Sequence, residues 1–207
     1  MRNNWTGQSE KIKYLSDKEL SHLLKTVIKK DRMHSCLFNL IYSYGLRVSE
    51  VVSLKVEHVN FDEKKILIER KKRKDKFKNQ TFKLSEENIQ RLKSHLRKRN
   101  KHPAAKKGNP YLFLSNKTRK IDQHISISRV QAIFHKYAIE AGLKDGWRYP
   151  HVLKHSAGVM LAKAGVSAAG IRDRLGHVSM ITTDVYTKLG GGEQEEADKK
   201  ADEALEL

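Results

Sequence analysis

His151-Val152-Leu153-Lys154-His155-Ser156 is the stretch that decides how this chain is interpreted, because it places two histidines and a lysine at the start of an expected helix. His151 and Lys154 are three residues apart and share one helix face, near the positive end of the helix dipole, which favours an anion. His155 points to a different side and is interpreted as a packing or orienting histidine. Zinc binding is disfavoured, because no cysteine or carboxylate completes a ligand set.

Two further motifs follow towards the C-terminus. Leu175-Gly176-His177 places a histidine directly after a glycine expected to end a helix, and Tyr186 lies nine residues later. A single tyrosine is usually structural, since a phenol with a pKa of about 10 is a poor nucleophile. Among arginines, histidines and lysines, however, a phenol can attack a phosphodiester whose transition state is stabilised by fixed charge, without metal or nucleotide.

Far upstream, Gly45-Leu46-Arg47-Val48-Ser49-Glu50 places an arginine after a glycine-terminated helix. The apolar neighbours of Arg47 predict a partly buried guanidinium. Glu50 can orient it from the same helical turn and leave donors free for a phosphate. An ordinary structural ion pair is the alternative.

A basic segment, residues 70–78, carries seven positive charges in nine residues. Charge runs are usually solvated, and phosphate tracking without chemistry is the simpler interpretation. The alternative is a general acid that gives a proton to a leaving alkoxide, and the residues do not decide among Lys71, Lys72 and Lys74. The segment also predicts DNA contacts from Lys72, Arg73, Lys74 and Lys76.

The composition favours a polyanionic partner. The 207 residues carry a net charge of +18, and the basic residues are spread along the whole length, so nucleic acid is the leading candidate and a merely solubilising surface the alternative. The single cysteine, Cys36, lies in an apolar stretch and is expected to be buried without a disulfide partner. No apolar run approaches a spanning helix and no signal-peptide pattern opens the chain, which predicts a cytoplasmic protein without membrane association.

Periodicity predicts a mainly α fold with a small three-stranded antiparallel β-sheet. The expected strands are Val56–Asn60, Lys65–Arg70 and Gln80–Leu84. Helices are expected after the capping box of Ser16 and Glu19, up to Gly45, over Val48–Leu54, after Ser85, and over Ser126–Ala141, Val152–Ala164 and Ser167–Leu175. The segment Asn100–Pro110 is expected to be turn-rich.

The expected organisation has three parts. Residues 1–15 form a flexible lead-in, residues 16–189 one domain, and residues 190–207 a glycine-rich break with an acidic tail.

In this order the motifs strongly resemble the catalytic domain of the tyrosine recombinases, the phage-integrase family of site-specific DNA strand exchangers. Gly-Leu-Arg47-Val-Ser-Glu50 resembles the family's first-arginine motif, and His151-x-x-Lys154-His155 its His-x-x-Arg-His box. Leu-Gly-His177 with Tyr186 resembles the last box. The resemblance implies the integrase catalytic-domain fold.

The resemblance also implies a role for each motif. Tyr186 attacks the scissile phosphate, forms a 3′-phosphotyrosyl link and releases a 5′-hydroxyl. Arg47 and Lys154 hold the non-bridging oxygens, while His151 and His177 assist through hydrogen bonds and proton transfer.

Further roles and partners are implied in the same way. Lys71 is the first choice for the general acid, and Glu50 and His155 are supporting residues. Because the bond energy is kept in the protein–DNA ester, no cofactor, ATP or metal is implied. The implied partner is double-stranded DNA, on which the chain assembles as a homo-tetramer from free monomers, with accessory DNA-binding proteins as further candidates.

Three departures from the family pattern limit what is carried over. Lys154 replaces the second arginine and loses its planar fork, which predicts weaker transition-state support. The hairpin loop between Lys71 and Leu84 is longer than usual for the family. The family usually carries a separate N-terminal helical domain, whereas here only about fifteen residues precede the first helix, as expected for a fragment or a minimal integrase. The alternatives are therefore a type IB topoisomerase-like nicking and closing enzyme, or a catalytically weakened DNA-binding protein on the recombinase scaffold.

Overall fold

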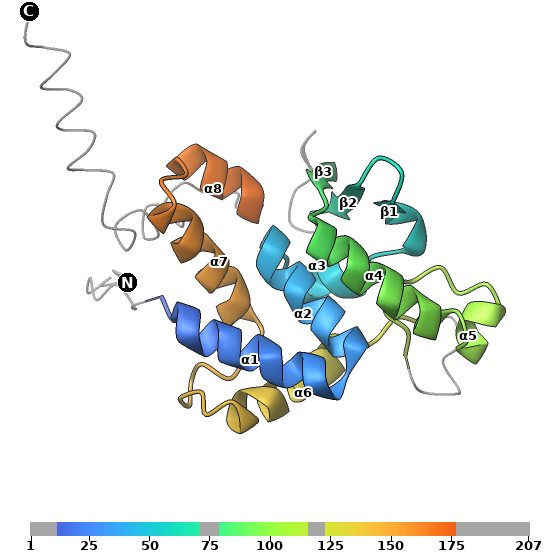
Figure 1. Ribbon diagram of the computed structural model, residues 1–207, viewed down its shortest axis with the longest axis horizontal. Helices are drawn as coiled ribbons and strands as arrows, with labels where there is room; N and C mark the ends of the chain where they lie inside the picture. The colour runs from blue at the N-terminus through green and yellow to red at the C-terminus, as the bar shows by residue number, and fades with distance from the viewer. Residues whose placement is uncertain (1–11, 71–78, 116–122, 177–207) are drawn as a thin grey trace, which may run out of the picture.

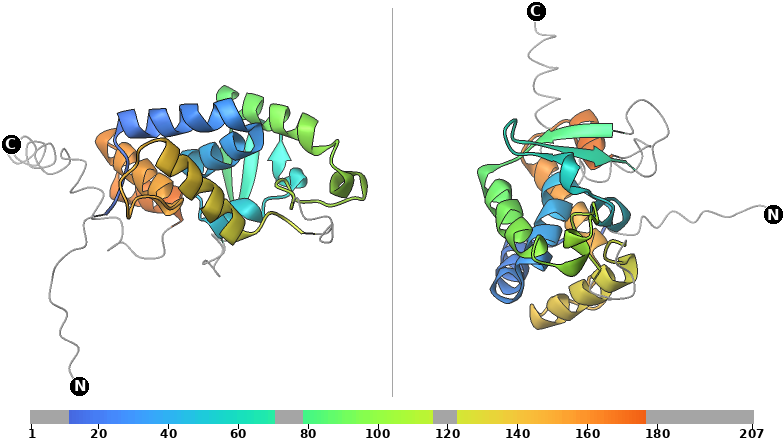
Figure 2. Two further views of the ribbon diagram at one scale, coloured as in Figure 1. Left: turned by 90° about the horizontal axis from the view of Figure 1, so that it is seen from below. Right: turned by 90° about the vertical axis from the view of Figure 1, so that its right-hand side faces the viewer.

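The computed structural model describes residues 12–70, 79–115 and 123–176, and over these residues it is mainly helical. The α-helices are α1 (Asp17–Lys30), α2 (Arg32–Tyr44), α3 (Val48–Val52), α4 (Glu86–Arg99), α5 (Pro103–Lys106), α6 (Ile127–Glu140), α7 (His151–Lys163) and α8 (Ala168–Leu175). α7 and α8 lie at one end of the molecule and α5 at the other (Figures 1 and 2). None of the described helices is long and apolar enough to cross a lipid bilayer.

A small antiparallel sheet packs beside α4 (Figure 1). Its order is β1 (Val59–Asn60), β2 (Lys65–Glu69) and β3 (Asn79–Lys83). Lys65 pairs with Lys83 at one end of β2 and Glu69 with Asn79 at the other, so the two longer strands form a regular hairpin. The predicted fold class, mainly α with a three-stranded antiparallel sheet, is confirmed.

Local capping chemistry sets most helix ends. Ser16 caps α1 and forms the predicted capping box with Glu19, while Ser85 and Ser126 each accept a backbone N–H at the start of α4 and α6. Gly45 ends α2 in the left-handed conformation with φ 56°, as its place in the sequence predicts.

Helix α2 lies at the centre of the main core. It packs against α1, α4 and α7, and its apolar residues, among them Phe38 and Ile41, are buried with side chains from the sheet and from α6. A second, smaller apolar cluster lies between α7 and α8, where Ile171 and Leu175 pack against alanines and a valine of α7. α8 is therefore anchored to the molecule through a limited apolar contact.

Two local expectations are wrong, and one short helix is not predicted. Val56–His58 is a 3-10 helix and only Val59–Asn60 pairs as a strand, because the His58 ring accepts the Lys55 N–H and closes a turn there. The segment Asn100–Pro110, expected to be turn-rich, contains the short helix α5. Leu15, expected in the flexible lead-in, is fully buried, and its N–H donates to Ser156 Oγ at 2.8 Å. The last residues of that lead-in therefore belong to the packed structure, and the three-part division stays a prediction.

Candidate active site

Arg47 stands at the start of α3, directly after the turn that ends α2. Its backbone N–H donates to Glu50 Oε2 at 2.8 Å, and its Nη1 donates to Glu50 Oε1 at 2.9 Å. The Arg47 side chain is 17% exposed and that of Glu50 is 0% exposed. The predicted contact is present, and one buried carboxylate fixes both the backbone and the guanidinium of Arg47.

Arg70 is the residue that sequence reasoning misplaces. It belongs to the basic run that is expected to be solvated, yet it is 0% exposed. Its Nη1 donates to Glu50 Oε2 at 3.2 Å and its Nε to Gln80 Oε1 at 2.7 Å, so Glu50 accepts from two arginines at once. Burial lowers the pKa of Arg70, and Glu50 opposes that shift by favouring the charged form.

A signal for this burial is present in the sequence. Ile66 and Ile68 are buried on β2, and alternate residues of a strand face the same side. Arg70 is the next residue in that alternation and is buried like the two isoleucines. The many charged residues that follow Arg70 in the sequence make this alternation difficult to recognise.

Helix α7 carries the His-x-x-Lys-His stretch at its first turn. His151 is exposed, whereas Lys154 is only 1% exposed and donates from Nζ to the Leu175 carbonyl oxygen. The rings of His151 and His155 meet edge to face, with centroids 4.6 Å apart and an interplanar angle of 86°. The expectation that His155 points to a different side is therefore wrong, while its interpretation as a packing or orienting residue agrees with this contact.

Both histidines favour the neutral form. Desolvation, followed by the charges of His155, Lys154 and Arg47, lowers the pKa of His151 to about 4, although part of the ring still meets solvent. Desolvation and Lys154 lower the pKa of His155 to about 4. A phosphate bound beside them would oppose these shifts, because a nearby anion favours the protonated ring.

The end of α8 is where the predicted motifs meet. Gly176 ends the helix with φ 63°, and its carbonyl oxygen accepts from Arg47 Nη2 at 3.4 Å. The preceding carbonyl, of Leu175, accepts from Lys154. The first-arginine motif and the His-x-x-Lys-His stretch, separated by about a hundred residues, therefore touch the turn that precedes His177.

Several predicted site residues lie outside the described part of the chain. They are Lys71, Lys72, Arg73, Lys74, Lys76, His177 and Tyr186. The acidic tail also lies outside it. Their roles stay predictions.

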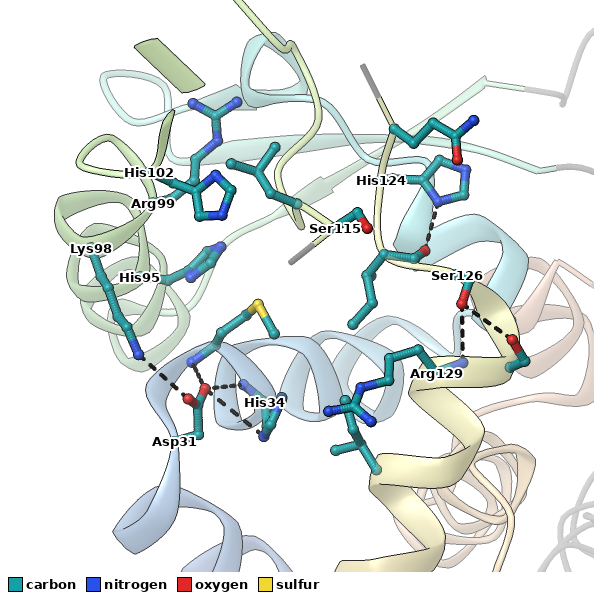
Figure 3. A pocket seen from close by; sticks show the side chains of 16 residues that line it. Asp31, His34, His95, Lys98, Arg99, His102, Ser115, His124, Ser126 and Arg129 are labelled. Atoms are coloured by element: carbon teal, nitrogen blue, oxygen red, sulfur yellow. Dashed lines mark hydrogen bonds and ion pairs between the residues drawn. The ribbon is translucent and has the colours of Figure 1, made fainter. Parts of the chain in front are cut away.

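A separate cavity of about 670 Å³ lies between the start of α2, the end of α4 and the start of α6 (Figure 3). It is lined by Asp31, His34, His95, Arg99 and Arg129 among others, and none of the described site residues lines it. Within residues 12–70, 79–115 and 123–176, no three His, Cys, Asp or Glu side chains gather closely enough to hold a metal ion.

On this fold Arg47 and Lys154 meet at the end of α8, as expected if these motifs belong to a phage-integrase catalytic domain. The model of the phage integrase family matches residues 13–191, and the chain belongs to that family.

Its relatives are tyrosine recombinases. The chain is 32% identical over 190 residues to tyrosine recombinase XerA of Pyrococcus furiosus, a match that covers 91% of this chain and 62% of the relative. It is 29% identical to tyrosine recombinase XerD of Caulobacter vibrioides, covering 86% of this chain and 58% of that protein. The chain thus spans about half to three fifths of the length of the curated relatives it matches.

Solved structures agree on the fold. A crystal structure of XerA recombinase superposes with a TM-score of 0.72 at 26% identity, covering 91% of this chain and 64% of that one. The XerH site-specific recombinase in a post-cleavage complex with palindromic difH substrate gives a TM-score of 0.77 at 23% identity, covering 94% of this chain and 55% of that one. The predicted catalytic-domain fold is confirmed.

Proposed function

We propose that this chain is the strand-cleaving and rejoining domain of a site-specific DNA recombinase that acts on duplex DNA. The observation that carries the proposal is the meeting of Arg47 and Lys154 at the turn before His177. A cluster of cations that is fixed before DNA binds can stabilise the charge that develops on a phosphate under attack. Membership of the phage integrase family and the net charge of +18 support the same function.

In the proposed reaction the Tyr186 hydroxyl gives its proton to a histidine such as His177, and its oxygen attacks the scissile phosphorus. The bond from phosphorus to the 5′ oxygen breaks, that oxygen takes a proton from a lysine such as Lys71, and a 3′-phosphotyrosyl ester remains. Arg47, oriented by Glu50, holds a non-bridging oxygen, and His151 serves as a hydrogen-bonding partner of the phosphate. Attack by a 5′-hydroxyl from the partner duplex reverses the step, which conserves the bond energy.

The test is to trap the covalent adduct. A library of nicked duplexes with randomised sequence around the nick loses the short strand after cleavage and prevents religation. We expect adducts that survive denaturation and whose recovered DNA defines a common site. Tyr186→Phe is the matched control, since it removes one oxygen and the nucleophile with it. No adduct from the unsubstituted chain, or an equal yield from Tyr186→Phe, would overturn the proposal.

A second candidate is a DNA-binding protein on this scaffold with weak cleavage. It is favoured by the burial of Lys154, which is 1% exposed and donates from its ammonium to the protein backbone. Lys154→Arg distinguishes the two, because a planar fork can serve the backbone and a phosphate together. A large gain in adduct yield would favour the weakened protein, and an unchanged yield would show that the lysine suffices. Relaxation of supercoiled plasmid without exchange between two sites would instead indicate a topoisomerase-like enzyme.

We also propose a homo-tetramer on DNA and a cytoplasmic location. Strand exchange between two duplexes needs four cleavages, one from each protomer, which supports the tetramer. The single cysteine, Cys36, is buried and has no second cysteine in the chain to pair with, which supports a reducing compartment. Sedimentation with and without the recovered site tests the assembly.

A further inference from the structure

The C-terminal end of α8 is bound by side chains from four separate elements. Four consecutive carbonyl oxygens, from Asp173 to Gly176, each accept one such contact. The donors are Gln80 Nε2 to Asp173 at 3.2 Å, Arg70 Nη2 to Arg174 at 2.5 Å, Lys154 Nζ to Leu175, and Arg47 Nη2 to Gly176 at 3.4 Å. They come from β3, from the end of β2, from α7 and from the start of α3.

Helix physics explains why donors gather here. The last carbonyls of an α-helix have no partner within the helix, and its C-terminus carries a partial negative charge that attracts cations. Three of the four donors are cationic. Because each binds a different carbonyl, together they fix the position and the rotation of the helix end, which a single cap would not do.

Arg70 is the centre of this arrangement. It joins the Arg174 carbonyl to Glu50, the same carboxylate that orients Arg47, and its Nε donates to Gln80. The guanidinium also lies 5.4 Å from the centroid of the Phe82 ring, where a cation is attracted to the aromatic face.

The backbone of Gly176 packs closely against the Arg70 side chain. A Cβ placed on Gly176 would lie 2.7 Å from Arg70 Nε, so the glycine is needed for close approach as well as for its positive φ. This close approach agrees with the carbonyl contacts in showing a tight fit between Arg70 and the end of α8.

We propose that Arg70, with Gln80, is a positioning residue for strand cleavage. Through Glu50 it aligns the Arg47 guanidinium, and through the Arg174 carbonyl it aligns the turn from which the chain continues to His177. Arg70 also directly precedes Lys71, so it anchors the strand end from which that predicted general acid follows. The inference rests on the proposed function for its catalytic meaning, while the alignment of α8 is a property of the fold.

The test compares Arg70→Lys with Arg99→Lys. Arg99 is the matched control because it is also a buried arginine, 9% exposed, that donates to backbone carbonyls, those of Asn109 and Tyr111. It lies away from the candidate site, at the cavity of Figure 3. Both variants should lose thermal stability, so all rates are measured at a temperature at which both remain folded.

Three readouts are needed. We expect Arg70→Lys to lower the single-turnover rate of adduct formation at saturating nicked duplex roughly 10- to 100-fold, with DNA affinity changed less than about threefold. We expect faster amide hydrogen exchange at the end of α8 in the same variant. Arg99→Lys should change neither the rate nor that exchange.

Gln80→Met provides a variant that is expected to fold, because Gln80 is partly exposed. It removes the acceptor of Arg70 and the donor to Asp173, and we expect a rate lower by about threefold to tenfold. Equal rates and equal exchange in the Arg70 and Arg99 variants would overturn the proposal, as would a Gln80→Met rate equal to that of the unsubstituted chain. If the unsubstituted chain forms no adduct, the proposed function fails, and the exchange comparison alone decides whether Arg70 aligns α8.

Discussion

The main core and the attachment of α8 hold this molecule together by different means. Around α2 the core is built from apolar side chains, and Phe38 and Phe134 meet edge to face with centroids 5.3 Å apart. α8 buries Ile171 and Leu175, but its C-terminal end is held by donors to its carbonyls. Apolar burial is non-directional, whereas hydrogen bonds depend on distance and angle. We infer that the core supplies stability and that the α8 attachment supplies orientation.

Glu50→Gln should have the largest effect on stability of the substitutions at the α8 attachment. Arg70 would keep its charge in a fully buried position without the carboxylate that balances it. Removing one partner of a buried ion pair typically costs about 3–5 kcal/mol, so we expect a loss of that size in the free energy of unfolding. Urea unfolding followed by circular dichroism measures it.

The matched control is Glu87→Gln. Glu87 is 74% exposed and pairs with Arg91 one helical turn away on α4. An i, i+4 helix pair whose carboxylate is exposed is worth about 0.3–0.5 kcal/mol. If Glu50→Gln lost no more than the control, the carbonyl contacts alone would be balancing Arg70, and the ionic part of the comparison would be wrong.

Gly176→Ala tests how tightly Arg70 is packed against the end of α8, because the added methyl group would clash with the Arg70 side chain. Its control is Gly165→Ala, since Gly165 follows α7 with φ 72° and a Cβ placed on it would meet no described atom within 4 Å. Both variants place an L-residue in the left-handed region, at a cost of about 1–2 kcal/mol. Gly176→Ala also forces Arg70 to move, which adds about 1 kcal/mol or more by overpacking. Equal losses of stability in thermal unfolding would show that Arg70 yields freely.

The fold is largely predictable because its signals are local. Serine caps, glycine stops and helical spacing depend on neighbours within about four residues. They predict the starts of α1 and α4, and both ends of α6 and α8, to within a residue or two. The strand expected from Val56 fails because a side chain, His58, closes a turn that propensity does not register.

The site is only partly predictable because its contacts are long-range. The pair of Arg47 and Glu50 lies within one turn and is predicted. Arg70 binds a carboxylate 20 residues before it and a carbonyl 104 residues after it, and neither separation leaves a local pattern. The burial of Lys154 depends in the same way on α8, 21 residues later in the chain.

Phe134→Leu tests whether the main core affects stability without affecting the orientation of α8. Phe134 is fully buried in the main core, and the smaller side chain should lower the free energy of unfolding by about 1–2 kcal/mol. We expect amide exchange at the end of α8 to stay as it is, measured well below the unfolding temperature. Ile139→Ala, at a side chain 50% exposed, is the control and should change stability by only a few tenths of a kcal/mol. Faster exchange at the end of α8 in Phe134→Leu would show that orientation depends on the core as well.

The smallest expected effect is a pH dependence that originates beside the α8 attachment. The pKa values of His151 and His155 are lowered to about 4, from an ordinary value near 6.5. Between these values the unfolded chain binds more protons than the folded one, so stability rises with pH across this window and is lost as pH falls from 6.5 towards 4. His155→Gln removes one of these groups and should flatten the curve, by about 1 kcal/mol across the window after allowance for solvent contact.

His135→Gln is the control for that measurement, because His135 is an exposed histidine on α6. His34 and His95 also have lowered pKa values, but they are present in both proteins and cancel from the difference. Urea unfolding at about pH 4.5, 5.5 and 6.5, which spans the window between the two pKa values, gives the two slopes. Because Lys154 is a cause of both shifts, Lys154→Met should raise both histidine pKa values and flatten the curve in the same direction. Equal slopes of stability against pH in His155→Gln and His135→Gln would mean that the rings of His151 and His155 are solvated in solution. The buried cations at the end of α8 would then have no effect on the pKa values of these two histidines.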